Sequence, residues 1–222
     1  MVNNLLRMIL TLELLLLSMS CLAGRTISGE KSPAIRLKIS LVGGSCVGKT
    51  NIICRLEGED FLPNMPATWG IDFSFLKRHV HEVNGRQTPF TIWIWDMPGV
   101  MRLRDMARYR LQHSNGVMIV YDITRKESFE HAQWWFDAIK SSYPFLLPVV
   151  ILVGNASDLA RSDRQISRAD AQAYADKNSM EYFEVSALKN QGVQEAFDAL
   201  VSKALPQVLP NLSADFVIAT ND

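Results

Sequence analysis

One short segment restricts the fold of this chain more than any other. Gly43 to Thr50 reads Gly-Gly-Ser-Cys-Val-Gly-Lys-Thr and fits the pattern G-x-x-x-x-G-K-[ST]. Ile35 to Leu41 alternate apolar and polar residues, which predicts a half-buried strand before it. Ile52, Ile53 and Leu56 follow with helical spacing, so the N-terminus of a helix would face a bound anion. This order of elements predicts a nucleoside-triphosphate site, in which backbone N–H groups wrap the phosphates, the lysine faces them and the threonine ligates Mg²⁺. The residues assigned to phosphate binding are Gly43, Gly44, Ser45, Cys46, Val47, Gly48, Lys49 and Thr50.

The composition limits what else the chain can be. With 222 residues, of which 48% are hydrophobic, it can bury one sizeable core and carry a tail. The formal net charge of +0 gives no electrostatic basis for binding nucleic acid. Cys21, Cys46 and Cys54 lack metal-ligand spacing and form no disulfide framework, so we expect a reducing compartment.

The N-terminal segment, residues 1–24, differs in kind from the rest. Leu5 to Leu17 are almost wholly apolar, but the run is too short to span a bilayer comfortably and contains Glu13. Three interpretations stay open: a cleaved signal, a membrane-associated interfacial helix, or an extension upstream of a native start at Met8 or Met19. Because a nucleotide-binding domain belongs where nucleotides and Mg²⁺ are supplied, we expect a cytoplasmic protein, with membrane association through this segment as one alternative, and not a secreted one.

The chain divides into a hydrophobic segment 1–24, a polar linker 25–34, a domain 35–205 and a tail 206–222. Within the domain, one antiparallel hairpin is followed by alternating strands and helices. This order predicts an α/β fold with a mixed, mostly parallel six-stranded sheet and helices on both faces. The predicted strands are 35–41, 73–83, 90–95, 116–121, 149–153 and 182–185, and the predicted helices follow Thr50 and span 127–140, 167–177 and 191–204.

A second motif follows the predicted strand 90–95. Asp96-Met97-Pro98-Gly99 has the spacing D-x-x-G. In a sheet of this kind, ligands bind at the carboxyl ends of the strands. Asp96 is therefore placed to hold a metal ion through a water, and the Gly99 N–H to meet a γ-phosphate.

A third motif, N-x-x-D, follows the predicted strand 149–153 and suits a guanine base. The carboxylate of Asp158 can accept hydrogen bonds from the ring N–H and the exocyclic amine of guanine, and adenine offers no such pair of donors. Asn155 completes the motif. Ser186, Ala187 and Leu188 close the next strand, where the Ala187 N–H would reach the guanine carbonyl oxygen.

With these motifs in order, residues 35 to 205 resemble the Ras superfamily of small GTPases, and the Rab branch most closely. Thr68 to Phe73, Thr-Trp-Gly-Ile-Asp-Phe, is similar to the switch I sequence T-I-G-V-D-F of that branch. The resemblance implies the P-loop NTPase (small G-protein) fold, GTP or GDP with Mg²⁺ as ligands, and partners that include effectors, an exchange factor and an activating protein. It also implies metal ligation by Thr50, Thr68 and Asp96, and an effector surface that includes Trp69, Ile71, Phe73 and Trp95.

Several positions depart from the family pattern. Val100 stands where the family has the glutamine that orients the attacking water, so no catalytic residue is assigned. Pro98 stiffens the segment beside Gly99, and Cys46 replaces a glycine, where a Cβ crowds the phosphates or forces strain. Ala156 and Leu188 replace two lysines that brace the base and ribose. The chain ends Ala-Thr-Asn-Asp, so we expect no C-terminal prenylation.

The sequence therefore favours a Rab-like GTP/GDP switch in membrane trafficking with slow intrinsic hydrolysis. A pseudo-GTPase or GTP-locked scaffold that does not cycle is the alternative, and whether hydrolysis occurs at all stays open. A P-loop ATPase or small-molecule kinase is a third class, which Asn155 and Asp158 disfavour.

Overall fold

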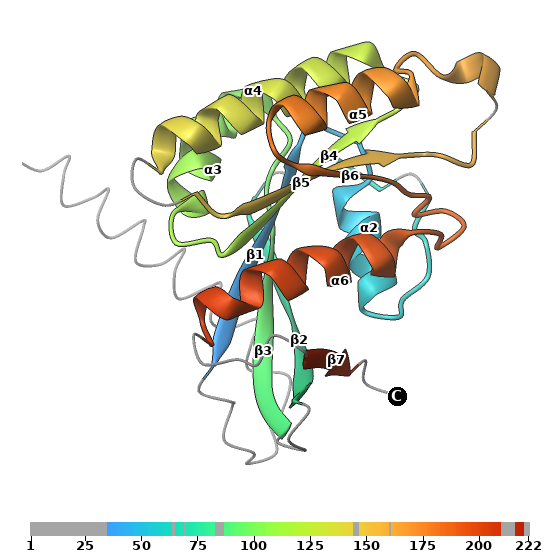
Figure 1. The fold of residues 1–222 in the computed structure, drawn as a ribbon. Coiled ribbons are helices and arrows are strands. Elements are labelled where there is room, and N and C mark those ends of the chain that lie inside the picture. Colours follow the sequence, from blue (N-terminus) through green and yellow to red (C-terminus); the bar gives the residue numbers. More distant parts are fainter. Residues whose placement is uncertain are drawn as a thin grey trace, which may run out of the picture. The chain divides into compact units, whose positions relative to one another are not determined.

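A central strand, β1 (Arg36–Gly43), lies between β3 (Gln87–Asp96) and β4 (Gly116–Asp122) in the sheet of this computed structural model (Figure 1). Beyond β4 the sheet continues with β5 (Val149–Asn155) and β6 (Glu181–Glu184). Beyond β3 it continues with β2 (Asp72–Glu82) and β7 (Phe216–Ala219). Among the described residues the sheet therefore has seven strands, in the order β6-β5-β4-β1-β3-β2-β7. Pairing is parallel except where β2 meets β3 and β7.

The structure describes residues 35–63, 65–68, 70–82, 87–143, 147–159, 161–209 and 216–219, which belong to one unit of the chain. The predictions for segments 1–24 and 25–34 lie outside these residues, as does the side chain of Trp69. No helix within the described ranges is long and apolar enough to cross a membrane.

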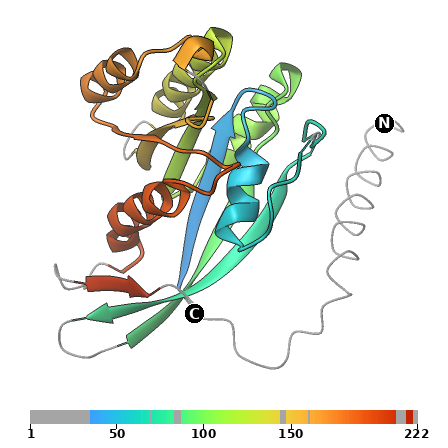
Figure 2. The same ribbon diagram turned by 90° about the vertical axis from the view of Figure 1, so that its right-hand side faces the viewer.

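Helices cover both faces of the sheet, as Figure 2 shows. On one face, α2 (Lys49–Leu56) and α6 (Val193–Ala204) pack over an apolar cluster that includes Ile39, Ile94 and Phe197. On the other face, three helices enclose a second cluster that includes Tyr121 and Trp135. These helices are α3 (Arg104–Leu111), α4 (Lys126–Ser142) and α5 (Arg168–Lys177). Short 3₁₀ helices lie at Met101–Leu103 (η2), Arg161–Asp163 (η3) and Leu205–Gln207 (η4).

The local sequence explains where these elements form. β4 is buried from Gly116 to Tyr121, because a parallel strand covered by helices on both faces needs apolar side chains on both sides. α5 begins where Ser167 Oγ accepts a hydrogen bond of 3.0 Å from the Asp170 backbone N–H, which is an N-cap.

The predicted fold class is confirmed, with one correction to the sheet. We predicted six strands and a tail from residue 206, but residues 216–219 of that tail form β7. This strand pairs antiparallel with β2 from His79 to Glu82 (Figure 2). Its sequence, Phe-Val-Ile-Ala, is only four residues long, so neither a strand period nor a helix period can be recognised in it. Pairing with a distant edge strand is what gives this segment its structure.

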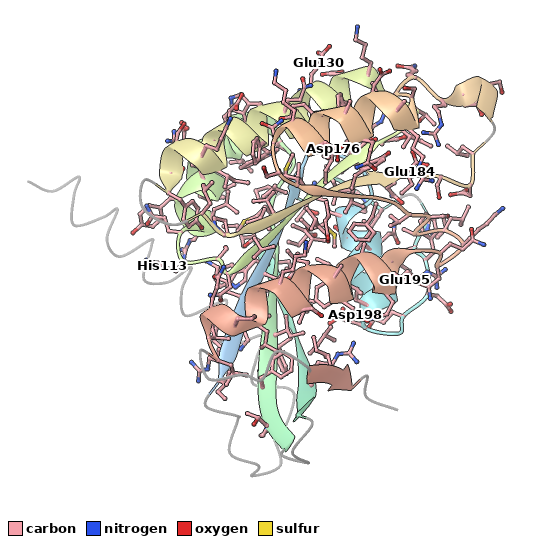
Figure 3. All side chains as sticks on the ribbon, viewed as in Figure 1. His113, Glu130, Asp176, Glu184, Glu195 and Asp198 are labelled. Carbon is pink, nitrogen blue, oxygen red and sulfur yellow. The ribbon has the colours of Figure 1, made fainter. Side chains whose placement is uncertain are left out.

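A polar network ties the far strands of the sheet together. The hydroxyl groups of Tyr121 on β4 and Tyr182 on β6 share a hydrogen bond of 2.8 Å, and Tyr182 donates to Glu184 Oε1 at 2.7 Å. Arg164 holds both oxygens of Glu184 at 2.8 and 3.0 Å. Glu184 lies near the end of β6, beside α5 (Figure 3). The network therefore fixes β6, the strand that leads into Ser186, Ala187 and Leu188.

Candidate functional site

The three predicted motifs meet in one cleft at the carboxyl ends of the strands. The cleft has a volume of about 490 Å³ and is lined by the loop after β1, residues 61–62 and 65–68, and the loops after β5 and β6. Asp96 lies beneath it, bonded to Thr50, while Ser186 and Ala187 are buried behind its wall. The predicted residues that line the cleft are Ser45, Cys46, Val47, Gly48, Lys49, Thr50, Thr68, Gly99, Asn155, Asp158 and Leu188.

The loop between β1 and α2 bends sharply at its two ends. Gly43 and Gly48 have φ angles of 148° and 91°, which L-residues rarely adopt. A Cβ at Gly48 would lie 2.2 Å from Asn155 Nδ2, so only glycine fits between the loop and the end of β5. Cys46 is also left-handed, with a φ of 56°, so the strain predicted for this replacement is present.

Every carbonyl of this loop accepts a hydrogen bond from the protein. Lys49, Arg125 and Asn155 supply three side-chain donors, and the Ile52 backbone N–H supplies the fourth. In a trans peptide the C=O and N–H groups point in opposite directions. Because the carbonyls of the loop face these protein donors, the N–H groups of the same peptides point away from the donors. The bonds are Lys49 Nζ to Gly43 O (3.4 Å) and Gly44 O (2.7 Å), Arg125 Nη2 to Ser45 O (3.2 Å) and Cys46 O (2.8 Å), Asn155 Nδ2 to Val47 O (2.9 Å), and Ile52 N to Gly48 O (2.9 Å).

Lys49 is a buried cation at the floor of the cleft. Its side chain belongs to a residue that is 5% exposed. Burial lowers the pKa of Lys49 from 10.5 to about 8; the Asp96 carboxylate opposes this shift and Arg125 adds to it. An anion placed against Nζ would stabilise the charged form of Lys49 and raise this pKa again, so the site favours anionic ligands.

Three oxygen atoms converge where a cation is expected. Thr50 Oγ1 donates to Asp96 Oδ2 at 2.5 Å and lies 3.2 Å from Thr68 Oγ1. Asp96 Oδ1 is buried and has no hydrogen-bond partner among the described residues. Burial is the main cause of a raised pKa of Asp96. Hydroxyl and carboxylate oxygens are the ligands that Mg²⁺ takes together with phosphates, so these residues fit that ion.

The motif predicted to recognise a base is held by its own hydrogen bonds. Asn155 Oδ1 accepts from the Ala187 N–H at 3.1 Å, and Asp158 Oδ1 accepts from Ser186 Oγ at 2.5 Å. The Ala187 N–H that we predicted to reach a base is therefore engaged by Asn155 in this structure. Arg55 of α2 donates to the carbonyls of Ala187 (2.9 Å) and Leu188 (3.0 Å) and so ties the loop after β6 to α2.

A second cavity of about 360 Å³ adjoins the loop where Val100 lies. The residues that line it include Gly99, Val100, Arg125 and His131. A Cβ at Gly99 would lie 2.4 Å from Gly44 O, so this segment rests directly on the loop after β1. The Val100 side chain offers this space neither a donor nor an acceptor.

Two of the aromatic residues predicted to face partners lie together. The rings of Phe73 and Trp95 are 5.9 Å apart between centroids, and Phe73 is 44% exposed. Lys38 Nζ lies 4.8 Å from the centroid of the Trp95 ring. Ile71 is partly buried and packs against the second apolar cluster.

Sequence reasoning missed two arginines that shape the site. Arg125 follows β4, the neighbour of β1, and contacts the loop although it lies 79 and 80 positions away in the sequence. Arg55 contacts the carbonyls of Ala187 and Leu188 from α2. Neither belongs to a nucleotide motif. The one signal for Arg125 is its place directly after β4, at the edge of the sheet where the other motifs end.

Comparisons with known proteins show which family this chain resembles. A family model described as the Ras family matches residues 38–206. Ras-related protein RABA5a of Arabidopsis thaliana is 33% identical over 174 residues, which cover 78% of this chain and 76% of that protein. Probable Ras-related protein Rab-4A of Echinococcus multilocularis is 36% identical over 77% of this chain and 74% of its own length. Ras-related protein Rab-2B of Dictyostelium discoideum is 32% identical over 83% and 86%.

Proposed function

The chain belongs to the Ras family, and from this membership we propose that it is a Rab-like GTP/GDP switch with slow intrinsic hydrolysis. Members of this family bind GTP or GDP with Mg²⁺. One observation carries the proposal: a single cleft joins a buried lysine, a triad of metal-type oxygens and a carboxylate suited to guanine. Lys49 and Thr50 begin α2, Asp96 ends β3 and Asp158 follows β5. Together these groups match the three chemical parts of the ligand.

Each part of the nucleotide has its own group of residues in this proposal. The loop after β1 binds the phosphates through its N–H groups and Lys49. Thr50, Thr68 and Asp96 hold Mg²⁺, which neutralises charge on the phosphate oxygens when it is bound. Asp158 accepts hydrogen bonds from guanine, and Asn155 ties the base loop to the phosphate loop through Val47 O and the Ala187 N–H.

Slow hydrolysis follows from the residues beside the γ-phosphate position. Attack on phosphorus needs a water held in line with the bond that breaks. Val100 occupies the position from which a glutamine would hold that water, and its side chain forms no hydrogen bond. Pro98 is buried and fixes its own φ, which restricts how the segment can close. These two residues also favour the second candidate, a GTP-locked scaffold.

The identity of the nucleotide on the purified protein tests both candidates. Protein purified in Mg²⁺ is denatured and the released nucleotide is separated by chromatography. Mostly GDP supports a cycling switch, and mostly GTP supports the locked scaffold. Absence of nucleotide, together with no binding of added GTP in millimolar Mg²⁺, would overturn both. Competition of labelled GTP by excess ATP tests the guanine assignment, because Asp158 offers adenine no matching donors.

A role in membrane trafficking is supported by the Rab names of the relatives. In this role Phe73, Trp95, Ile71 and Trp69 contribute to the surface that effectors contact. Membrane association through residues 1–24 is part of the proposal. Sedimentation with anionic vesicles tests it: the full chain should pellet and a chain that begins at Gly24 should not.

A further inference from the structure

We propose that Arg125 is a positioning residue that holds the phosphate loop in its anion-binding conformation and thereby compensates for Cys46. The proposal rests on the proposed function, because the ligand of the loop is taken to be a nucleotide phosphate chain. It concerns two residues that no nucleotide motif specifies.

Cys46 is the residue at which the loop is least stable by itself. Its φ of 56° lies in the left-handed region, where a Cβ crowds the following carbonyl. For an L-residue this conformation is disfavoured by about tenfold or more against the right-handed one. Glycine at this position would adopt it without that cost. A loop that carries cysteine here therefore needs an external restraint.

Arg125 restrains the two peptide groups on either side of Cys46. Its Nη2 donates to Cys46 O at 2.8 Å and to Ser45 O at 3.2 Å. Rotation about φ of Cys46 turns the peptide that carries Ser45 O, and rotation about ψ turns the peptide that carries Cys46 O. One guanidinium group thus fixes both torsion angles of the strained residue.

The guanidinium is itself held in place from the other side. Arg125 Nε donates to Asp122 Oδ2 at 3.0 Å. Asp122 Oδ1 in turn accepts from the Thr124 N–H at 2.9 Å and the Thr124 hydroxyl at 2.7 Å. Asp122 ends β4, so the restraint connects the loop to the rigid sheet.

The same two peptide groups carry the donors that a phosphate would need. The N–H groups of Cys46 and Val47 belong to the peptides whose carbonyls Arg125 holds, and they point the opposite way. Without Arg125, Cys46 can leave the left-handed region and turn these N–H groups away. A nucleotide must then restore the strained conformation when it binds, so it binds more weakly and dissociates faster.

A double-mutant cycle tests this coupling. Wild type, Arg125→Ala, Cys46→Gly and the double variant are loaded with fluorescent GDP, and its release is followed in excess unlabelled GDP with Mg²⁺. Arg125→Ala should accelerate release by about tenfold in the Cys46 background and by less than about threefold in the Cys46→Gly background. Lys126→Ala removes the neighbouring exposed cation and should leave release unchanged.

Urea unfolding of the nucleotide-free proteins gives a second, independent readout, in which the Cys46→Gly background should show the larger effect of Arg125→Ala. Loss of Arg125 should lower the urea midpoint less when residue 46 is cysteine, because the loop can then leave the left-handed conformation and lose its strain. Equal acceleration of release in both backgrounds would overturn the proposal, since Arg125 would then act through charge alone. Equal midpoint shifts in both backgrounds would overturn it as well. If wild type retains no nucleotide, the proposed function fails, and the urea cycle still decides the role of Arg125.

Discussion

The Thr50 hydroxyl donates a hydrogen bond of 2.5 Å to Oδ2 of Asp96, which joins the start of α2 to the end of β3. The other carboxylate oxygen, Oδ1, is buried without a partner among the described residues. A buried acceptor left in this way is costly unless a ligand completes it. The pair therefore has the arrangement of a cation site in which the two ligands already lie in contact.

Removing the Thr50 hydroxyl should abolish the effect of Mg²⁺ on nucleotide retention. In wild type we expect chelation of Mg²⁺ to accelerate GDP release by about tenfold or more, which corresponds to about 1.4 kcal/mol. In Thr50→Val release should already be fast, and chelation should change it little. Thr91→Val is the matched control, because the Thr91 hydroxyl is buried without a partner among the described residues. A Thr50→Val variant that still responds to chelation as wild type does would contradict the metal assignment.

Nucleotide affinity should fall as the pH rises above about 8. The pKa of Lys49 in the free protein is lowered to about 8, chiefly by burial. Phosphates beside Nζ favour the charged form and raise this pKa, so binding takes up a proton wherever free Lys49 is neutral. Below about pH 8 no proton is needed; above it, affinity should decline by up to about tenfold per pH unit. GDP titrations from about pH 7 to about pH 9.5 measure this slope.

The control for this slope is Lys49→Arg, whose guanidinium stays charged throughout the range. This variant should bind GDP more weakly, because its longer side chain fits the floor of the cleft poorly. Its affinity should not decline above about pH 8 as the wild-type affinity does. Calorimetry near pH 8.5 in two buffers of different ionisation enthalpy should show proton uptake in wild type alone. A flat wild-type profile would mean that Lys49 remains charged before the nucleotide arrives.

Val100→Gln should raise the rate of GTP hydrolysis. A glutamine amide at this position supplies a donor and an acceptor for the attacking water. We expect the single-turnover rate constant to rise by about tenfold or more, a decrease of about 1.4 kcal/mol in the barrier. Val100→Leu changes size without polarity and should leave the rate unchanged. If the glutamine variant is as slow as wild type, the limit lies in Pro98 or in the loop after β1.

Gly99→Ala should break the close packing of the segment after β3 against the phosphate loop, because the added methyl group clashes with the loop backbone. The added methyl group would lie 2.4 Å from Gly44 O and 2.5 Å from Ser45 N, which are backbone atoms. We expect a loss of about 1–3 kcal/mol in unfolding free energy and a reduced preference for GTP over GDP. Gly70→Ala is the control, since a Cβ there meets no atom within 4 Å. Urea unfolding and the ratio of GTP to GDP affinities measure the two effects; wild-type values for Gly99→Ala would contradict the packing argument.

The parts of the fold that the sequence predicts well are those decided by local pattern. The short apolar run from Gly116 to Tyr121 is typical of a parallel strand buried on both faces, and β4 forms there. The phosphate-loop motif is equally local, because the pattern G-x-x-x-x-G-K-[ST] can be recognised within eight consecutive residues. The positions of Asp96 and Asn155 follow in turn from the rule that parallel strands end at one edge.

Distant contacts account for what the sequence does not predict. Phe216 to Ala219 form a strand because they pair with the edge of β2. The sequence of these four residues contains no signal that predicts this pairing. Arg125 resembles any basic residue at the start of a helix until the loop carbonyls are placed beside it. The Ala187 N–H was expected to meet a base, and its bond to Asn155 depends on a side-chain orientation that no motif encodes.

The hydrogen bonds to the phosphate loop also have a consequence for the order of folding. The loop ends at residue 48, but its donors include Arg125 and Asn155, and the strand before it, β1, pairs with β3 and β4. During synthesis the loop leaves the ribosome long before these partners exist. It cannot take its final shape until the chain has been made as far as the end of β5. The loop is therefore translated early but reaches its final conformation late. A ribosome stalled before residue 155 would carry a chain unable to retain a nucleotide.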